Sequence, residues 1–203
     1  MPRIVSKFCS VFAITLATIL QFNGSALAAA EMQLLGKTSA PIGYVGFCKD
    51  NPRDCGQYTR RDLVVKLTKP TLNQLNTVNR TINAAVEPAT DMDIYGVVER
   101  WAYPALKGDC EDYVLLKRRT LIQDGWPASA LLVTVVRDEV GDGHAVLTVR
   151  TNRGDLILDN KTDVIRLWSD TDYHYVKRQS SEIQNAWDMI SDNRAVEVGS
   201  IRR

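Results

Sequence analysis

The sequence predicts an α+β domain in which the helices come first and an antiparallel sheet follows. Apolar side chains recur at helical spacing over residues 70–86, and residues 109–124 form a second segment typical of a helix. Beyond residue 130 the hydrophobic period changes to two, in segments rich in Val, Leu and Thr. Because helices precede strands instead of alternating with them, the pattern favours the α+β class.

The first 28 residues have the composition of a secretory signal peptide. Arg3 and Lys7 precede an apolar run at residues 8–20, and an A-x-A pattern ends at Ala28. An uncleaved membrane anchor is the alternative, but the run is short for a span, which needs about 20 residues. We therefore expect a periplasmic or secreted protein with no stable membrane insertion after cleavage.

Residues 29–203 are predicted to form a single domain, because no repeat or linker interrupts them and their length supports one core. Loss of Arg3 and Lys7 with the signal peptide lowers the formal net charge from +1 to −1. Such a chain has no basic surplus with which to neutralise phosphates, which argues against a nucleic-acid partner.

The helical part of the domain has clear boundaries. Residues 29–47 are expected to be extended or irregular. Pro70 suits the first turn of the helix over 70–86, and Pro88 closes that segment. Residues 91–104 are then expected to connect it to the second helix.

The second half of the domain is predicted to be mainly strands. The segments with strand-like composition are 130–138, 144–151, 155–160, 164–168 and 173–179. Residues 181–191 are predicted to form a short terminal helix.

Hydrophobicity fixes the register of one hairpin in this sheet. The apolar residues of both strands favour the core, which pairs Leu147 with Leu158. This register places His144 and Asp159 on the same face, one diagonal step apart. A slip by one residue would separate them, but it would also put the two apolar sets on opposite faces.

The cysteines divide into a pair and a single residue. In an oxidising compartment, Cys48 and Cys55 in "CKDNPRDC" are predicted to form a local disulfide. A zinc knuckle is the alternative, but no second ligand pair has suitable spacing. Cys9 leaves with the signal peptide, so Cys110 remains unpaired.

Cys110 lies in "GDCEDY", at the predicted start of the second helix. Asp109 suits the N-cap and Asp112 the third helical position, an acidic variant of the capping box. Unpaired N–H groups and the helix dipole favour an anion here, which would lower the pKa of the thiol. The flanking carboxylates oppose the thiolate. An ordinary half-buried cysteine is therefore the alternative.

Together these positions suggest nucleophilic catalysis. A thiol at a helix start and a His–Asp pair at one end of a hairpin are the groups that such a reaction needs. Cys110 is the predicted nucleophile, His144 the group that takes and returns the proton, and Asp159 the group that orients the imidazole.

The segments "GDCEDYVLLKRRTL", "GHAVLTVRTNRGDLILDN" and "YGVVERWAYP" resemble the bacterial transglutaminase-like cysteine peptidases. This papain-related group includes the LapG-type periplasmic proteases. The resemblance extends from about Gly43 to Gln179. It implies a papain-like/transglutaminase-like fold with the catalytic cysteine at a helix N-terminus, and the triad Cys110, His144 and Asp159.

The same resemblance implies further site residues. LapG-type members bind calcium through acidic residues beside the catalytic cysteine, and Asp109, Glu111 and Asp112 match that description. A divalent cation would offset the repulsion between these carboxylates and a thiolate. Trp101 is a weaker candidate, as an indole N–H donor to an oxyanion, and a core tryptophan is the alternative. Other side chains nearby are predicted to be packing or surface residues, namely Tyr113, Trp168, Tyr173, His174 and Tyr175.

The function expected from the sequence is an exported, calcium-dependent cysteine endopeptidase that hydrolyses a protein or peptide substrate through a thioester. The resemblance also implies a surface adhesin as substrate and an inner-membrane receptor as regulatory partner. A transamidase on the same triad is one alternative. A non-catalytic binding module is another, which the intact Cys, His and Asp disfavour.

Overall fold

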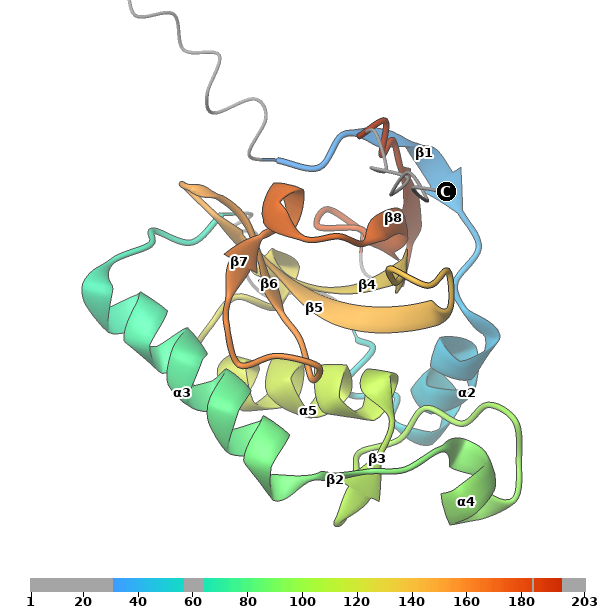
Figure 1. Ribbon diagram of the computed structural model, residues 1–203. Coiled ribbons are helices and arrows are strands. Elements are labelled where there is room, and N and C mark those ends of the chain that lie inside the picture. Colours follow the sequence, from blue (N-terminus) through green and yellow to red (C-terminus); the bar gives the residue numbers. More distant parts are fainter. Residues whose placement is uncertain (1–30, 57–63, 184, 195–203) are drawn as a thin grey trace, which may run out of the picture.

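The computed structural model describes residues 31–56, 64–183 and 185–194 (Figure 1). The predicted signal peptide, residues 1–28, lies outside this part of the chain. Among the described residues, no helix combines the length and apolarity needed to cross a membrane.

The described residues form helices and strands in the expected order. The helices are α2 (Ile42–Asp50), α3 (Lys69–Ala85), α4 (Asp91–Tyr95) and α5 (Cys110–Gln123), with short 3-10 turns η1 (Ala128–Ala130) and η2 (Trp168–Asp170). The strands are β1 (Leu34–Thr38), β2 (Glu87–Pro88), β3 (Lys107–Gly108), β4 (Leu131–Arg137), β5 (Gly143–Thr151), β6 (Gly154–Leu158), β7 (Arg166–Leu167), β8 (His174–Gln179) and β9 (Trp187–Ile190). The main sheet has the order β1-β9-β8-β4-β5-β6-β7, and β2 and β3 form a separate parallel pair.

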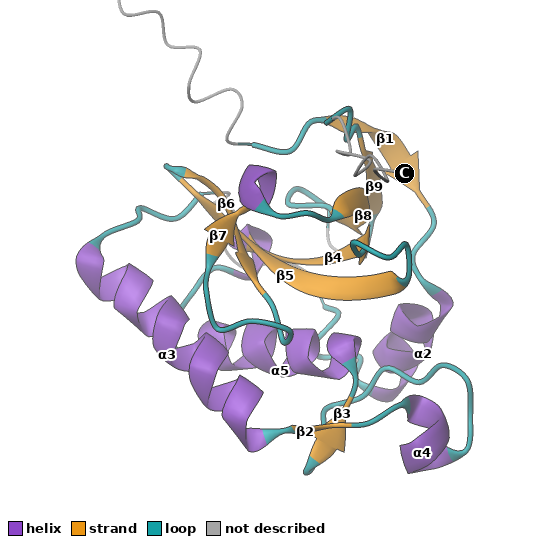
Figure 2. Cartoon of the chain, viewed as in Figure 1, coloured by secondary structure: helices purple, strands orange, loops and turns teal. Residues whose placement is uncertain are grey.

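The helices cover one face of the main sheet (Figure 2). Neighbouring strands of that sheet are antiparallel throughout. Leu147 and Val149 of β5 point into the larger core, where they join Leu75 of α3 and Leu121 of α5. A smaller cluster on the other sheet face includes Trp168 of η2. The predicted α+β class is therefore confirmed.

The predicted hairpin register is also confirmed. Leu147 faces Leu158, and Thr151 faces Gly154 at the turn. Gly154 has a φ of 108°, a left-handed conformation that favours glycine. The hydrophobic pattern was sufficient here because both strands bury the same kind of side chain on the same face.

Two predictions of local structure are wrong. Residues 181–191 contain strand β9 instead of a helix, and β9 joins β1 to β8. Trp187 and Ile190 are buried there, and their spacing suits a helix turn as well as a short strand. Residues 29–47, expected to be extended or irregular, contain the strand β1 but also most of the helix α2, which buries Tyr44 and Phe47 and was not predicted.

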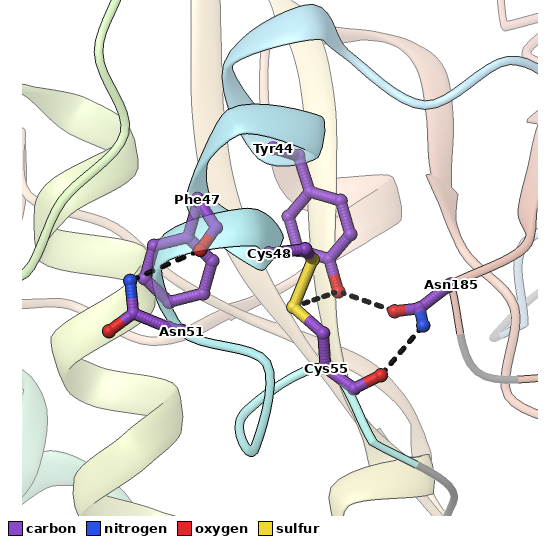
Figure 3. The surroundings of a disulfide bond; sticks show 6 residues. All are labelled: Tyr44, Phe47, Cys48, Asn51, Cys55 and Asn185. Carbon is purple, nitrogen blue, oxygen red and sulfur yellow. Dashed lines mark hydrogen bonds between the residues drawn. A yellow bond between two sulfur atoms is a disulfide. The ribbon is translucent and has the colours of Figure 1, made fainter.

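The Cys48–Cys55 disulfide joins the end of α2 to the turn that follows it (Figure 3). The Tyr44 hydroxyl lies 3.6 Å from the Cys55 sulfur. Asn185 donates from its side-chain amide to the Cys55 carbonyl at 2.6 Å. The bridge thus ties α2 to the following turn, and Asn185 links that turn to the connection between β8 and β9.

We expect the double variant Cys48→Ser/Cys55→Ser to lose about 2 to 3 kcal/mol of unfolding free energy, because the bridge restricts a short loop in the unfolded chain. Urea unfolding with and without a reductant measures this loss. The wild-type protein should fall to the level of the double variant when reduced, and the variant should not respond. Equal stability of the oxidised and reduced wild type would contradict the role of the bridge.

Lys117 of α5 is fully buried, and its Nζ has no hydrogen-bond partner among the described residues. The nearest aromatic contact is the Tyr113 ring, whose centroid lies 5.7 Å from Nζ. Burial lowers the pKa of Lys117 to about 7, although the charges of Asp159 and Asp163 partly offset this effect. Folding therefore places an ionisable group where its charge is disfavoured.

Lys117→Met should stabilise the protein by about 1 to 3 kcal/mol at pH 7. Because folding lowers the pKa of this lysine from 10.5 to about 7, the folded protein binds fewer protons than the unfolded chain between these values. The unfavourable contribution of Lys117 to stability should therefore diminish from pH 7 towards pH 10, and the advantage of the variant over the wild type should shrink with it. Denaturant unfolding at several pH values tests this, with exposed Lys69→Met as the control. A pH-independent difference would be the contrary result.

Candidate active site

Cys110 is the first residue of α5, as the sequence predicts, but the predicted capping box does not form. Asp109 occupies the N-cap position, and its side chain makes no capping hydrogen bond. The Asp112 side chain accepts from the backbone N–H of Ala102 at 2.8 Å. The Asp109 side chain is thus free of the capping role that its position suggested.

The surroundings of the Cys110 thiol oppose its ionisation. Burial raises the pKa of the thiol, and the charge of Glu111 and a hydrogen bond to it raise the pKa further. That bond runs from the Cys110 Sγ to Oε2 of Glu111 at 3.0 Å. Burial and the Glu111 carboxylate thus oppose the lowering of the thiol pKa that the helix start predicts.

The Cys110 sulfur lies next to β5. A backbone hydrogen bond from Ala145 to the thiol partly offsets the rise in its pKa. Ala145 directly follows His144 near the start of β5. The start of α5 is thus packed against the strand end that carries the histidine.

His144 and Asp159 meet as the hairpin register predicts. His144 Nε2 and Asp159 Oδ1 are 2.9 Å apart, and each side chain is only 3% exposed. Asp159 directly follows β6, and His144 lies near the start of β5, so the hairpin brings the two side chains together. Burial opposes ionisation of Asp159, but hydrogen bonds from His144 and Tyr173, with the histidine's charge, lower the pKa of this carboxyl.

A cluster of acidic side chains surrounds the start of α5. Asp91, Asp109 and Glu111 place one carboxylate oxygen each within 4.8 Å of one another. Asp91 begins α4 and is 2% exposed. Asp112, which the sequence also suggested, lies beside this group. Oδ1 of Asp91, Oδ1 of Asp109 and Oδ2 of Asp112 are buried and have no hydrogen-bond partner among the described residues.

Proton affinity in this acidic cluster is unusually high. Burial, together with the charge of Glu111, raises the pKa of Asp109 to about 8. Burial also raises the pKa of Asp112 to about 7 and increases that of Glu111. Buried carboxylates without donors favour either protonation or a cation. Their oxygens are the hard ligands that Ca²⁺ takes, so the donor set fits that ion.

Trp101 is a buried core residue whose ring meets Tyr44 edge-on, with centroids 5.9 Å apart. Its Nε1–H donates to Oε1 of Glu99 at 2.7 Å. A Cβ at Gly43 would lie 2.2 Å from Trp101 Cδ1, so only glycine leaves room for this ring. The oxyanion role of Trp101 stays a prediction, and it requires Glu99 to release the indole N–H.

Sequence reasoning missed two side chains of this region. Asp91 was assigned to a connecting segment, and Tyr173 to packing or the surface. Tyr173 donates its hydroxyl proton to Oδ2 of Asp159 at 2.5 Å. The proximity of Asp91 to Asp109 and the contact of Tyr173 with Asp159 both join elements that are distant in the chain, so no local spacing indicates them.

A thiol at a helix start, packed against an antiparallel sheet with a buried His–Asp pair, is the arrangement expected of a cysteine hydrolase of the α+β class. The chain belongs to the bacterial transglutaminase-like cysteine proteinases, since the sequence pattern of that family matches residues 34–195. It is therefore a cysteine peptidase. No curated protein matches the sequence.

Solved structures of LapG from Legionella pneumophila are similar to this chain. One has 27% sequence identity and a TM-score of 0.50, over 60% of this chain and 70% of LapG. The calcium-bound form has 25% identity and a TM-score of 0.51, over 74% of this chain and 90% of LapG. The EGTA-treated form has 26% identity and a TM-score of 0.50, over 62% and 74% respectively. These matches support the transglutaminase-like fold and show that one similar protein binds calcium.

Proposed function

We propose that the protein is an exported endopeptidase that hydrolyses a protein substrate through a thioester on Cys110, with His144 and Asp159 completing the triad. The buried hydrogen bond between His144 and Asp159 carries this proposal, because it lies at the start of β5, where the first turn of α5 packs against the strand. Membership in a cysteine peptidase family supports the role of the thiol.

The proposed chemistry follows from which nitrogen of His144 is hydrogen-bonded to Asp159. Asp159 accepts the Nε2–H of His144, so Nδ1 is left to take the thiol proton. The sulfur then attacks the substrate carbonyl, and the C–N bond breaks as His144 returns the proton to the leaving amine. Water hydrolyses the thioester with His144 as the base. Backbone N–H groups at the start of α5 are the proposed oxyanion donors, with Trp101 as the predicted addition.

Activation of the thiol requires that Cys110 give up its hydrogen bond to Glu111. We propose that Asp91, Asp109 and Glu111 bind calcium, with Asp112 contributing through its unpartnered Oδ2. When bound, calcium supplies the positive charge that offsets these carboxylates beside the thiol. The calcium-bound LapG structure supports this choice of ion.

Location and partners are proposed on the sequence alone. The predicted signal peptide supports a periplasmic or secreted enzyme. A surface adhesin as substrate and an inner-membrane receptor as regulator rest on the resemblance to LapG-type proteases. Comparing products with and without an added primary amine separates hydrolysis from transamidation.

Cys110→Ala and His144→Ala should each lower peptidase activity at least about a hundredfold, because each removes a group that acts in the bond-breaking steps. The measurement compares the exported proteins of cells that produce the wild type or a variant, and a substrate should remain uncut in the variant cells. His174→Ala is the matched control, since this histidine is half-exposed and the sequence has only two. Normal cleavage by Cys110→Ala would disprove the proposal.

Calcium should raise the melting temperature, and by more at pH 8 than at pH 5.5. Folding raises the pKa of Asp109 to about 8 and of Asp112 to about 7, so protons compete with the cation at the lower pH. In chelator, the folded protein binds more protons than the unfolded chain, so stability should fall as pH rises from about 4 to 8.

Calorimetry with excess calcium or with a chelator measures this response. Asp91→Asn should weaken the calcium effect at least about tenfold in apparent affinity, because the variant removes one charged ligand. The control is Asp50→Asn, an exposed acid at the end of α2. If calcium leaves the melting temperature unchanged at both pH values, the proposed calcium site is excluded.

A further inference from the structure

Tyr173 contacts both members of the His–Asp pair. The residue directly precedes β8, and its hydroxyl donates to Oδ2 of Asp159 at 2.5 Å. Its ring meets the His144 imidazole at an interplanar angle of 69°, with centroids 5.4 Å apart. One side chain therefore touches the imidazole and the carboxylate at the same time.

Asp159 divides its two oxygens between different donors. Oδ1 accepts from His144 at 2.9 Å and from the backbone N–H of Lys161 at 3.1 Å. Tyr173 is the donor to Oδ2 among the described residues. A carboxylate rotates readily about its terminal torsion, so an unpartnered Oδ2 would allow the two oxygens to exchange places. A buried unpartnered oxygen is also costly.

We propose that Tyr173 is a positioning residue that keeps Oδ1 of Asp159 directed at Nε2 of His144, and thereby keeps Nδ1 of His144 unprotonated and ready for the thiol proton. This inference rests on the proposed catalytic roles of Asp159 and His144. Tyr173 itself acts through the carboxylate and does not take part in the bond-breaking steps.

The surroundings of Tyr173 keep its hydroxyl protonated. Burial raises the pKa of Tyr173, and its hydrogen bond to Asp159 and that carboxylate's charge raise the pKa further. A cavity of about 270 Å³ borders Tyr173 and Asp159. The other charged groups that line this cavity are Glu139, Lys161, Arg166 and Asp172. The hydroxyl thus remains a donor at neutral pH.

Tyr173→Phe removes this one oxygen and keeps the ring. The test is ¹⁵N NMR of the imidazoles in the purified calcium-loaded protein. The wild type should show His144 in one neutral tautomer, with the proton on Nε2. In the variant the ratio of the two tautomers should change about tenfold, as expected for the loss of one hydrogen bond to a charged group. His174, the other histidine, serves as an internal reference.

The matched control is Tyr175→Phe. The Tyr175 hydroxyl bonds to Thr171 at 3.0 Å, so its removal leaves the donors of Asp159 in place. This control should leave the His144 tautomer unchanged. On a cleaved substrate, Tyr173→Phe should lower kcat about tenfold with KM within about twofold, and should move the acid limb of activity to higher pH. The limb moves in this direction because Asp159 loses a donor that favours its charged form.

Asp159→Ala, which removes the acceptor, separates failure of this inference from failure of the proposed function. If Tyr173→Phe retains the wild-type tautomer while Asp159→Ala changes it and loses activity, the positioning role is wrong and the triad stands. If Asp159→Ala also retains the wild-type tautomer and activity, the triad itself is wrong, and the role of Tyr173 with it. Should Tyr173→Phe not fold, 3-fluorotyrosine at position 173 strengthens the same donor, and an unchanged His144 spectrum would overturn the inference.

Discussion

The central constraint on this structure is that carboxylates buried near the thiol need hydrogen-bond donors or a cation to balance their negative charge. Asp159 has such partners, because His144, the Lys161 backbone and Tyr173 all donate to it. Their combined effect holds the pKa of Asp159 below its ordinary value in spite of burial. Asp109 has no comparable set of donors, and its pKa rises to about 8. The two ends of the site thus differ in how charge is balanced.

The fold places these two environments side by side. The larger core fixes α5 against β5 through Leu121 and Leu147, and this packing sets the start of α5 beside the start of β5. The hairpin register then fixes His144 relative to Asp159. The geometry of the site therefore depends on apolar packing, whereas its charge balance depends on the few polar side chains that reach it.

This division explains how much the sequence could predict. The β5–β6 register and the position of Cys110 at a helix start follow from patterns that are local in the chain, and both are observed. Strand β9 was wrongly predicted as a helix because its short apolar pattern fits both structures and only pairing with β1 and β8 decides between them. Asp91 and Tyr173 reach the site across long sequence separations, which leave no periodic signal.

The hydrogen bond from Cys110 to Glu111 has a consequence for how activity would be controlled. A thiol that donates to a carboxylate is held in its protonated form, so the helix dipole alone does not produce a nucleophile here. In the proposed mechanism, engaging Glu111 elsewhere would remove that acceptor and leave the thiol proton to the imidazole. If the acidic cluster binds a cation as proposed, ligand binding and thiol activation involve the same carboxylate. The acidic residues around Cys110 would then make activity conditional on the cation, which explains why they flank a nucleophile that they otherwise disfavour.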